Sequence, residues 1–481
     1  MQKIRNLEGL KERLWKVKTP VVGVGISAFN RTSLDGYLPC YSIICAKNSR
    51  DLEILQRDFK IISLEKIPPK ERISRNPVNM LKQKEAKKFL EKLNKPYLLF
   101  YRVTEKLERV CDKNGWGLIG NRSSVFFDNK VRFRRVMEEL DLPLIPGEVL
   151  KVNELNYDSL SGKYGQFAIQ LQKESGGKGT FFIRGGEDFE KCTKKIGGKF
   201  ADSEVLITKF IHGPSPSITG CVTKHGVLYT DLQYQLLDIP EVMNTKVGSG
   251  IFCGHDWTSS DDFPSRIKKQ AYEYAEAIGN YLKGRGYKGI FGLDMIMEDG
   301  RVYVVELNPR LLGSFPVLTM AQELNREPLL IGFHILEFLN EDYEIDLKEV
   351  NRLIKKPKRG AQLILFNKHK QFAENKKSLR PGIYVVEGDE IIYLRPGYKL
   401  SDLKQKNEFI ITDGVPFENT VFKPHGRILK ILTLEKIMNK NTFKLNKWMK
   451  EVVGKVFEKL EMVPLGTSFK PVKQIDYYEG N

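Results

Sequence analysis

The sequence of 481 residues has few cysteines and no long apolar run. Its six cysteines, at positions 40, 45, 111, 192, 221 and 253, include no Cys-x-x-Cys pair, so neither a zinc site nor a disulfide framework is indicated. No stretch approaches the length of a membrane span, and the N-terminus lacks the apolar core of a signal peptide. We therefore expect reduced thiols, no membrane partner and a cytoplasmic location.

Acidic residues are outnumbered by basic ones, 60 against 78, which gives a formal charge of +18. Such an excess can indicate a nucleic-acid partner. However, the lysines are spread over the segments 82–95, 355–370 and 436–459, where Glu and Asp partly alternate with them at helical spacing, as on solvated helix faces. We do not expect a nucleic-acid partner, because an anionic small molecule accounts for the charge equally well.

The length allows about three domains. The first, over residues 1–120, is expected to be a small α/β domain, because short apolar segments in it resemble buried strands. These segments are 20–27, 41–45, 98–101 and 116–120. Gly23-x-Gly25-x-x-Ala28 loosely matches a dinucleotide fingerprint, but Gly36 and Pro39 interrupt the helix that should follow, and no acidic residue closes the second strand. The pattern argues against a NAD(P) site, and we expect the glycines to permit close backbone approach instead.

Hydrophobic pattern and chemistry agree best in the segment 289–310. Two strand-like runs flank Asp299-Gly300, which is a strong hairpin signal. Side chains alternate along a strand, so Glu306 and Asn308 share a face. Asp294 lies on the same face only if the residue numbers of each cross-strand pair add to an even number, such as 600 when Asp294 pairs with Glu306. We expect this register to require a three-residue loop, with Gly300 in or beside the left-handed position, rather than a two-residue loop.

With that register, two carboxylates and one amide oxygen converge on a buried face. Carboxylates held so close repel each other, so the arrangement favours a cation between them. Hard oxygen ligands suit Mg²⁺, with Mn²⁺ as a possible substitute, and nucleotide phosphates and water can complete its coordination. The alternative is a surface hairpin on which Asp294 and Glu306 are solvated.

The pattern Glu306-Leu-Asn308-Pro-Arg310 at a strand end, with Asp294 twelve positions before Glu306, resembles the ATP-grasp superfamily. The resemblance covers roughly residues 120–335, and we expect the ATP-grasp nucleotide-binding and catalytic domain over 121–340. It implies that Asp294, Glu306 and Asn308 bind the metal. It also implies a catalytic role for Arg310, whose planar fork suits the transferring phosphoryl group or an acyl phosphate oxygen.

The same resemblance implies nucleotide contacts upstream of the hairpin. The predicted helix 128–140 contains Lys130, which would reach an ATP phosphate; the alternative is one more surface lysine. A glycine-rich turn joins the predicted strands 167–171 and 181–183 and can wrap backbone N–H groups around phosphates. Its residues are Ser175, Gly176, Gly177, Lys178 and Gly179, and Lys178 is expected to act in catalysis.

Two positions depart from the ATP-grasp pattern. Gln170 stands where most relatives carry a phosphate-binding lysine, so that contact is either neutral or supplied by Lys173 or Lys178. The strand 204–211 is expected to offer backbone groups to adenine and a side chain to ribose. Thr208 and Lys209 stand there, followed by Ile211, and the usual Glu is missing.

The remainder, residues 355–481, is expected to be a β-rich domain with a terminal helix. Predicted strands lie at 361–366, 383–386 and 391–394, a helix at 444–460, and a boundary linker at 355–359. The expected fold is therefore α/β (α+β): a Rossmann-like N-terminal domain, an ATP-grasp domain and a β-rich C-terminal domain, the last similar to that of biotin carboxylase.

The resemblance implies an ATP-dependent ligase that activates a carboxylate as an acyl phosphate and couples it to an amine or similar nucleophile. Two alternatives stay open. A biotin-type carboxylase would need biotin on itself or on a partner, and Met449-Lys450 lies in a helical period rather than at a hairpin tip. A nucleotide-binding protein without catalysis is suggested by Gln170 and Thr208.

Overall fold

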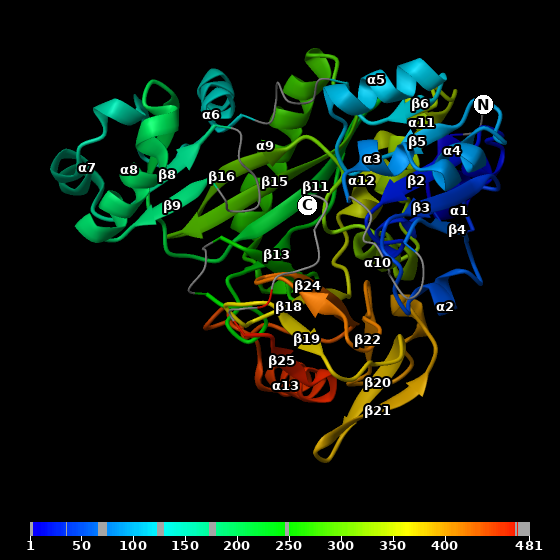
Figure 1. Ribbon diagram of the computed structural model, residues 1–481. Helices are drawn as coiled ribbons and strands as arrows, with labels where there is room; N and C mark the ends of the chain where they lie inside the picture. Colours follow the sequence, from blue (N-terminus) through cyan, green and yellow to red (C-terminus); the bar gives the residue numbers. More distant parts are fainter. Residues whose placement is uncertain are drawn as a thin grey trace.

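The computed structural model describes residues 3–34, 36–65, 75–122, 129–172, 179–245, 250–466 and 469. Figure 1 shows three parts: an N-terminal α/β layer, a small sheet with its helices at the far side, and a long central sheet that runs into the C-terminal region. The mixed helix and sheet architecture confirms the predicted α/β fold class. Among the described residues, no helix is long and apolar enough to cross a membrane.

The N-terminal part is a parallel sheet with strand order β4-β3-β2-β5-β6. Its side chains alternate between two cores: Val21 and Ile43 pack with helices α1 and α11 (Leu330–Phe338), whereas Val22 and Ile44 pack with α3, α4 and α5. Helices therefore cover both faces, as a parallel sheet requires. The bounds are α1 (Leu7–Trp15), β2 (Val21–Gly25), η1 (Phe29–Arg31), β3 (Tyr41–Cys45), α2 (Leu52–Leu55), β4 (Lys60–Ser63), α3 (Pro77–Leu81), α4 (Lys84–Leu90), β5 (Tyr97–Leu99), α5 (Glu105–Asn114) and β6 (Gly117–Ile119).

The small sheet is antiparallel, with order β7-β10-β8-β9, and buries its own core against α7 and α8. Helix α6 leads into it. Asn129 caps α6 by accepting a hydrogen bond from the Arg132 amide at 3.0 Å, which fixes Lys130 in the first turn. The bounds are α6 (Lys130–Glu139), β7 (Gly147–Lys151), α7 (Tyr157–Tyr164), β8 (Phe167–Leu171), β9 (Thr180–Ile183), α8 (Gly186–Phe200) and β10 (Glu204–Lys209).

The central sheet runs in the order β16-β15-β11-β13-β14-β18-β24-β22-β20-β21, and β12 pairs with β11. Helix α9 buries an apolar stripe, including Ile267, Ala271 and Ile278, against this sheet. Pro328 lies between the helices α10 and α11, which follow the hairpin. The bounds are β11 (Pro216–Thr223), β12 (Gly226–Tyr229), β13 (Gln233–Leu237), β14 (Phe252–Asp256), α9 (Ser265–Gly284), β15 (Gly289–Glu298), β16 (Arg301–Asn308), α10 (Val317–Leu324) and α11 (Leu330–Phe338).

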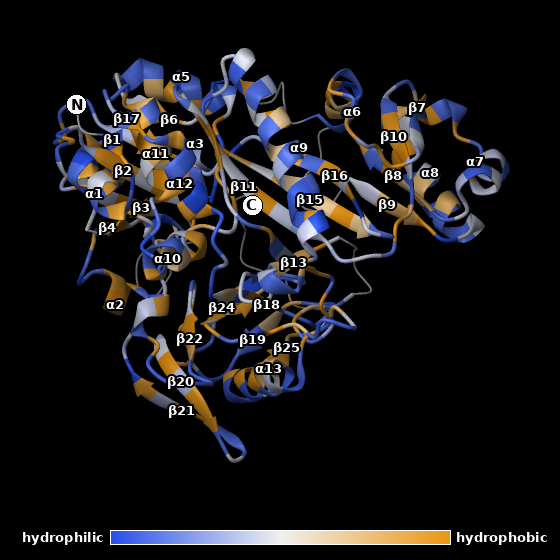
Figure 2. Ribbon diagram, turned by 180° about the vertical axis from the view of Figure 1, so that it is seen from behind, coloured by the Kyte–Doolittle hydropathy of each residue, from blue (hydrophilic) through white to orange (hydrophobic). Residues whose placement is uncertain are grey.

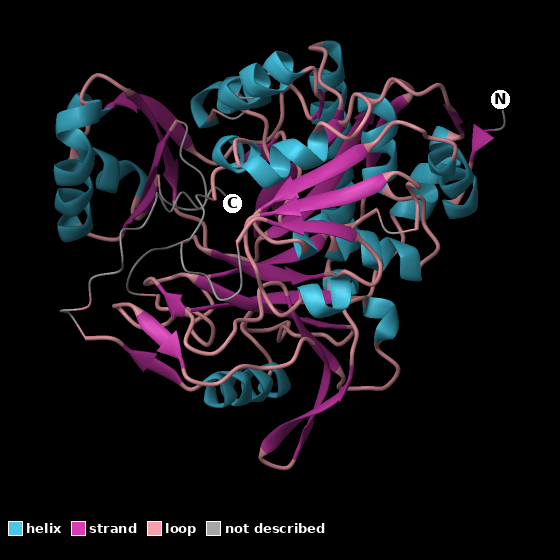
Figure 3. Cartoon of the chain, turned by 45° about the vertical axis from the view of Figure 1, so that its right-hand side comes forward, coloured by secondary structure: helices cyan, strands magenta, loops and turns pink. Residues whose placement is uncertain are grey.

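Most strands of the C-terminal region continue the central sheet, and β23, β19 and β25 form a separate three-stranded sheet. Strand β18 pairs with β14 on one side and with β24 on the other. Figure 3 shows the β20–β21 hairpin extending from this sheet at the bottom of the molecule. The bounds are α12 (Leu347–Ile354), β18 (Ala361–Phe366), β19 (Ala373–Asn375), β20 (Gly382–Glu387), β21 (Glu390–Arg395), β22 (Phe409–Thr412), β23 (Val421–Phe422), β24 (Arg427–Thr433), α13 (Lys447–Leu460) and β25 (Met462–Pro464).

The expected linker 355–359 connects α12 to β18 but is not a solvated spacer. Its Lys358 side chain is buried and lies 2.9 Å from the buried carboxylate of Glu327. Helix α13 is amphipathic, as its alternating colours in Figure 2 show, and it buries Met449 and Val456. The domain limits 1–120, 121–340 and 355–481 stay a prediction. The central sheet contains strands from both the second and the third of these segments, so it crosses the boundary between them.

Candidate active site

The β15–β16 hairpin places the predicted acidic residues on one face, but its turn and strand pairing differ from the predicted ones. Asp294 pairs with Glu306 and Gly292 with Asn308, so the paired numbers sum to 600 as expected. The predicted three-residue loop is wrong. Glu298 pairs with Arg301 across a two-residue turn in which Asp299 and Gly300 both have positive φ, 50° and 71°.

A β-bulge restores the even register. Met295 pairs with Val304 while Asp294 pairs with Glu306, so Val305 is the extra residue between them. Without the bulge, the two-residue turn would place Asp294 opposite Val305 and turn Glu306 to the other face. The bulge therefore brings the two carboxylates to the same side of the sheet.

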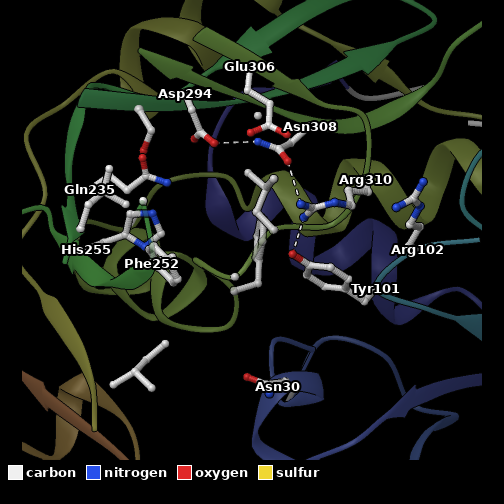
Figure 4. A pocket seen from close by; sticks show the side chains of 18 of the residues that line it. Asn30, Tyr101, Arg102, Gln235, Phe252, His255, Asp294, Glu306, Asn308 and Arg310 are labelled. Atoms are coloured by element: carbon white, nitrogen blue, oxygen red, sulfur yellow. Dashed lines mark hydrogen bonds between the residues drawn. The ribbon is translucent and has the colours of Figure 1, made fainter. Parts of the chain in front are cut away.

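Four side chains form a hydrogen-bonded chain across the site, drawn with dashed lines in Figure 4. Asn308 Nδ2 donates to Asp294 Oδ2 at 2.8 Å, and Arg310 Nη2 donates to Asn308 Oδ1 at 2.7 Å. Arg310 also donates to the Tyr101 hydroxyl, and its guanidinium lies 4.6 Å from the centre of the Tyr101 ring. Tyr101, from the loop after β5, thus links the N-terminal sheet to the polar residues of the hairpin.

The two carboxylates of the hairpin, Asp294 and Glu306, lie in different electrostatic surroundings. Burial and the neighbouring Glu306 carboxylate raise the pKa of Asp294 to about 6, against the weaker effects of Arg310, Asn308 and Gln235. Lys130 Nζ lies 2.9 Å from Glu306 Oε1, so the lysine that was expected to reach a phosphate here forms an ion pair with an expected metal ligand.

These residues fit a hard divalent cation. Asp294 and Glu306 supply two carboxylates, which is what Mg²⁺ takes when phosphates and water complete its shell. Among the described residues, no group of three His, Cys, Asp or Glu side chains could hold a metal alone. Asn308 presents its amide nitrogen to Asp294 and its oxygen to Arg310, so its oxygen would bind a metal only after the amide turns.

The residues expected at the nucleotide line the facing side of the small sheet. Gln170 on β8 is buried, and its Nε2 donates to Thr180 Oγ1 on β9 at 3.3 Å. Lys209 Nζ lies 3.7 Å from Glu298 Oε2. Thr208 and Ile211 are buried beside Lys209, and Gly179 accepts a hydrogen bond from the Leu171 amide. Ser175, Gly176, Gly177, Lys178 and Lys173 lie outside the described residues.

A cavity of about 620 Å³ joins the two sides. Its lining includes Gln170, Thr208, Lys209 and Ile211 from the small sheet side and Asp294, Glu306, Asn308 and Arg310 from the hairpin. It also includes residues after β2, in the loop after β5, and on β14 and β24. Of the predicted site residues that the structure describes, all but two line this cavity. The two exceptions lie next to lining residues: Lys130 forms an ion pair with Glu306, and Gly179 precedes Thr180.

The cavity also borders His255 and Tyr101, which are not among the predicted site residues. His255 lines it, as Figure 4 shows, and burial together with the Lys430 charge lowers the pKa of His255 to about 3. The amide of Gln362 donates to His255 Nδ1 at 2.9 Å, which leaves the ring proton on Nε2. From the sequence alone, a lone histidine such as His255 is more often structural than functional. Tyr101 is found only through the fold.

Comparison with known proteins defines the class. Residues 127–314 match the family model of the ATP-grasp domain. The carbamoyl phosphate synthase arginine-specific large chain of Geobacillus stearothermophilus is 24% identical over 226 residues, which are 44% of this chain and 20% of that protein. The large chain from Clostridium acetobutylicum is 21% identical over 246 residues, 50% of this chain and 22% of the other. The chain thus spans about a fifth of the length of these curated relatives.

Solved structures share the fold over most of the chain. The biotin carboxylase domain of the Hydrogenobacter thermophilus 2-oxoglutarate carboxylase, solved with MgADP, ADP and bicarbonate, has a TM-score of 0.54 at 14% identity and covers 86% of each chain. Biotin carboxylase from Campylobacter jejuni has a TM-score of 0.56 at 13% identity, covering 87% of this chain and 88% of its own. An ADP complex of N5-carboxyaminoimidazole ribonucleotide synthetase has a TM-score of 0.53 at 12% identity, covering 92% and 99%.

The match of residues 127–314 to the ATP-grasp domain confirms the resemblance inferred from Asp294, Glu306, Asn308 and Arg310. The identities to the solved structures are low, so they establish the fold and leave the substrates open.

Proposed function

We propose that the protein is an ATP-dependent carboxylate-amine ligase that releases ADP and phosphate. One observation carries the proposal: the Asp294–Glu306 pair and Arg310 border a single cavity that opens to the small sheet on one side and to the N-terminal and C-terminal regions on the other. A nucleotide and a second substrate can therefore meet at Arg310.

The reaction needs no protein nucleophile. A substrate carboxylate oxygen attacks the γ-phosphorus of ATP, the bond to the β-phosphate oxygen breaks, and ADP leaves. An amine nitrogen then attacks the acyl carbon, phosphate leaves, and the amine loses a proton. Arg310 can stabilise the oxygens that gain charge in both steps, because its planar fork is held by Asn308 and Tyr101.

Asp294 and Glu306 would hold Mg²⁺, with Asn308 as a third ligand, and the bound ion would offset charge on the ATP phosphates. Lys130 would exchange its Glu306 partner for a phosphate oxygen when ATP binds. Gln170, Thr208, Lys209 and Ile211, with the turn 175–179, would surround the nucleotide. In this arrangement the protein supplies position and electrostatics rather than covalent chemistry.

The test is a screen for phosphate release with purified protein, Mg-ATP and pooled carboxylic acids and amines. We expect release only when both substrate types are present, with Glu306→Gln inactive and the hairpin-tip variant Asp299→Asn active. Asn accepts the left-handed conformation found at position 299, so this control leaves the turn intact. Release that is equal in wild type and Glu306→Gln would refute the proposed site.

A biotin-type carboxylase is the second candidate, because the likeness to biotin carboxylases extends into the C-terminal region and covers 86% of the chain or more. It predicts ATP cleavage with bicarbonate and free biotin in place of carboxylic acid and amine. The same screen separates the two candidates if it includes one well with bicarbonate alone and one with bicarbonate and biotin.

A further inference from the structure

The glycines of Gly23-x-Gly25 make room for the side chain of Arg31. A Cβ atom at Gly23 would lie 2.3 Å from the Tyr41 hydroxyl and 2.9 Å from Arg31 Cβ, and one at Gly25 would lie 3.3 Å from Arg31 Cγ. Arg31 is buried, and its Nε donates to the Val24 carbonyl at 3.0 Å. The glycine pair therefore holds a guanidinium at the C-terminal edge of the parallel sheet, where α/β folds bind ligands.

Two lysines approach the same place from other elements. Lys430 on β24 lies 2.9 Å from Asp413 Oδ2 and donates to Asn30 Oδ1 at 3.1 Å. Lys47, after β3, donates to the Gly414 carbonyl at 3.0 Å and forms no ion pair with the described residues. All of these residues except Gly414 carry a polar or charged side chain that lines the cavity, and Figure 4 places Asn30 across it from the Asp294–Arg310 chain.

This end of the cavity carries a clear excess of positive charge. Its described lining from the N-terminal and C-terminal regions has one acidic side chain, Asp413. The cationic side chains there are Arg31, Lys47, Arg75, Arg102, Arg427 and Lys430. Arg31 and Lys47 make hydrogen bonds to backbone carbonyls rather than to carboxylates. Buried cations that outnumber the neighbouring carboxylates are costly, and a bound anion would offset that cost.

We propose that Arg31, Lys47, Lys430 and Asn30 form an anion subsite, which binds a carboxylate or phosphate group of the ligase substrate away from the reacting carboxylate. This inference rests on the proposed function only where it identifies the bound anion as part of a ligase substrate. A substrate held at this subsite would reach through the cavity to Arg310, so the enzyme would select molecules with a second anionic group.

Protonation of Lys47 gives the subsite a measurable signature. Burial first, and then the charge of Arg75, lower the pKa of Lys47 to about 8, while Asp413, Asp51 and Glu65 act in the opposite direction. A bound anion favours the charged ammonium, so binding takes up a proton where Lys47 is neutral. For a group with this pKa, anion affinity should fall about tenfold between pH 7 and pH 9.

Calorimetric titration of the nucleotide-free protein tests the subsite. The probes are sulfate, which stands for a phosphate ester, and succinate, which stands for a carboxylate; neither changes charge between pH 7 and pH 9. Lys47→Met removes the ammonium. Asn30→Asp is isosteric and places a carboxylate 3.1 Å from Lys430 Nζ, where it competes with the ligand. Lys348→Met, on the exposed face of α12, is the matched control.

We expect at least one probe to bind saturably, with affinity reduced at least about tenfold in Lys47→Met and Asn30→Asp and unchanged in Lys348→Met. The pH dependence should disappear in Lys47→Met. Stronger binding of sulfate than of succinate identifies a phosphate ester, and the reverse order a carboxylate. Absence of saturable binding, wild-type affinity in both Lys47→Met and Asn30→Asp, or a flat pH profile in the wild type would overturn the inference. Because no nucleotide is present, failure of the ligase assay leaves this result unaffected.

Discussion

Asp294→Asn should stabilise the ligand-free protein at pH 8 while abolishing turnover. Asp294 sits beside Glu306, and burial raises its pKa from 3.8 to about 6. At about 1.4 kcal/mol per pKa unit, this shift corresponds to about 3 kcal/mol of unfavourable interaction once the carboxyl is ionised. Asp294 also lines the cavity, where water solvates part of its charge, so we expect a gain of about 1–2 kcal/mol in the free energy of unfolding.

The sign of the pH dependence follows from the direction of the shift. The folded protein binds the Asp294 proton more tightly than the unfolded chain does, so the destabilisation is absent below about pH 4. It develops as the pH rises towards 6 and is complete above that value. Asp294→Asn should therefore match the wild type at pH 4 and exceed it at pH 8.

Thermal unfolding at both pH values measures the effect. If the chain unfolds as one unit, a gain of about 1–2 kcal/mol raises Tm by about 1–2 °C, and by more if the central sheet unfolds separately. Asp299→Asn on the same hairpin changes the same residue type in an exposed position and should leave Tm unchanged. An equal or lower Tm for Asp294→Asn at pH 8 would refute the reasoning about the paired carboxylates.

Three further substitutions test separate contacts. Glu306→Gln should keep the fold, although it weakens the partner of Lys130, and should lower phosphate release at least about 100-fold; normal release would remove Glu306 from the metal site. Arg310→Lys keeps the positive charge but loses the planar guanidinium fork, so kcat should fall about 10-fold or more. Nucleotide affinity, measured by calorimetry, should change little, and an unchanged kcat would contradict the role assigned to Arg310. Lys358→Met leaves the buried Glu327 carboxylate without its partner and should lower the free energy of unfolding, measured by chemical denaturation, by about 3–5 kcal/mol. The double variant Lys358→Met/Glu327→Gln should recover part of this loss, and additive losses would argue against the ion pair.

The pattern of residues predicted which side chains share the hairpin face, because alternation along a strand is strict. It could not predict how that register arises. The bulge at Val305 leaves one β-branched residue unpaired, and nothing in a run of valines marks which one. For this reason the alternation argument predicts a three-residue loop, whereas the structure has a two-residue turn at Asp299-Gly300 and a bulge.

Contacts between distant segments were also invisible in the sequence. Lys130 could be placed at the start of a helix, but its ion pair with Glu306, 176 positions away, depends on the packing of helix α6 against the hairpin. Lys358 belongs to a run of basic residues that is typical of a linker, yet it is buried against Glu327. The glycines at 23 and 25 were correctly expected to permit close approach, but the sequence could not identify Arg31 as the group that approaches.

Product analysis tests the central claim most directly. With the substrate pool that supports turnover, ADP, AMP, phosphate and pyrophosphate are quantified from the same reaction by chromatography. The proposed role of Asp294, Glu306 and Arg310 at the phosphate end of the nucleotide predicts ADP and phosphate in equal amounts, with little ATP loss when the acceptor is omitted. AMP and pyrophosphate as the stoichiometric products would contradict the acyl-phosphate mechanism even though the ATP-grasp fold stands.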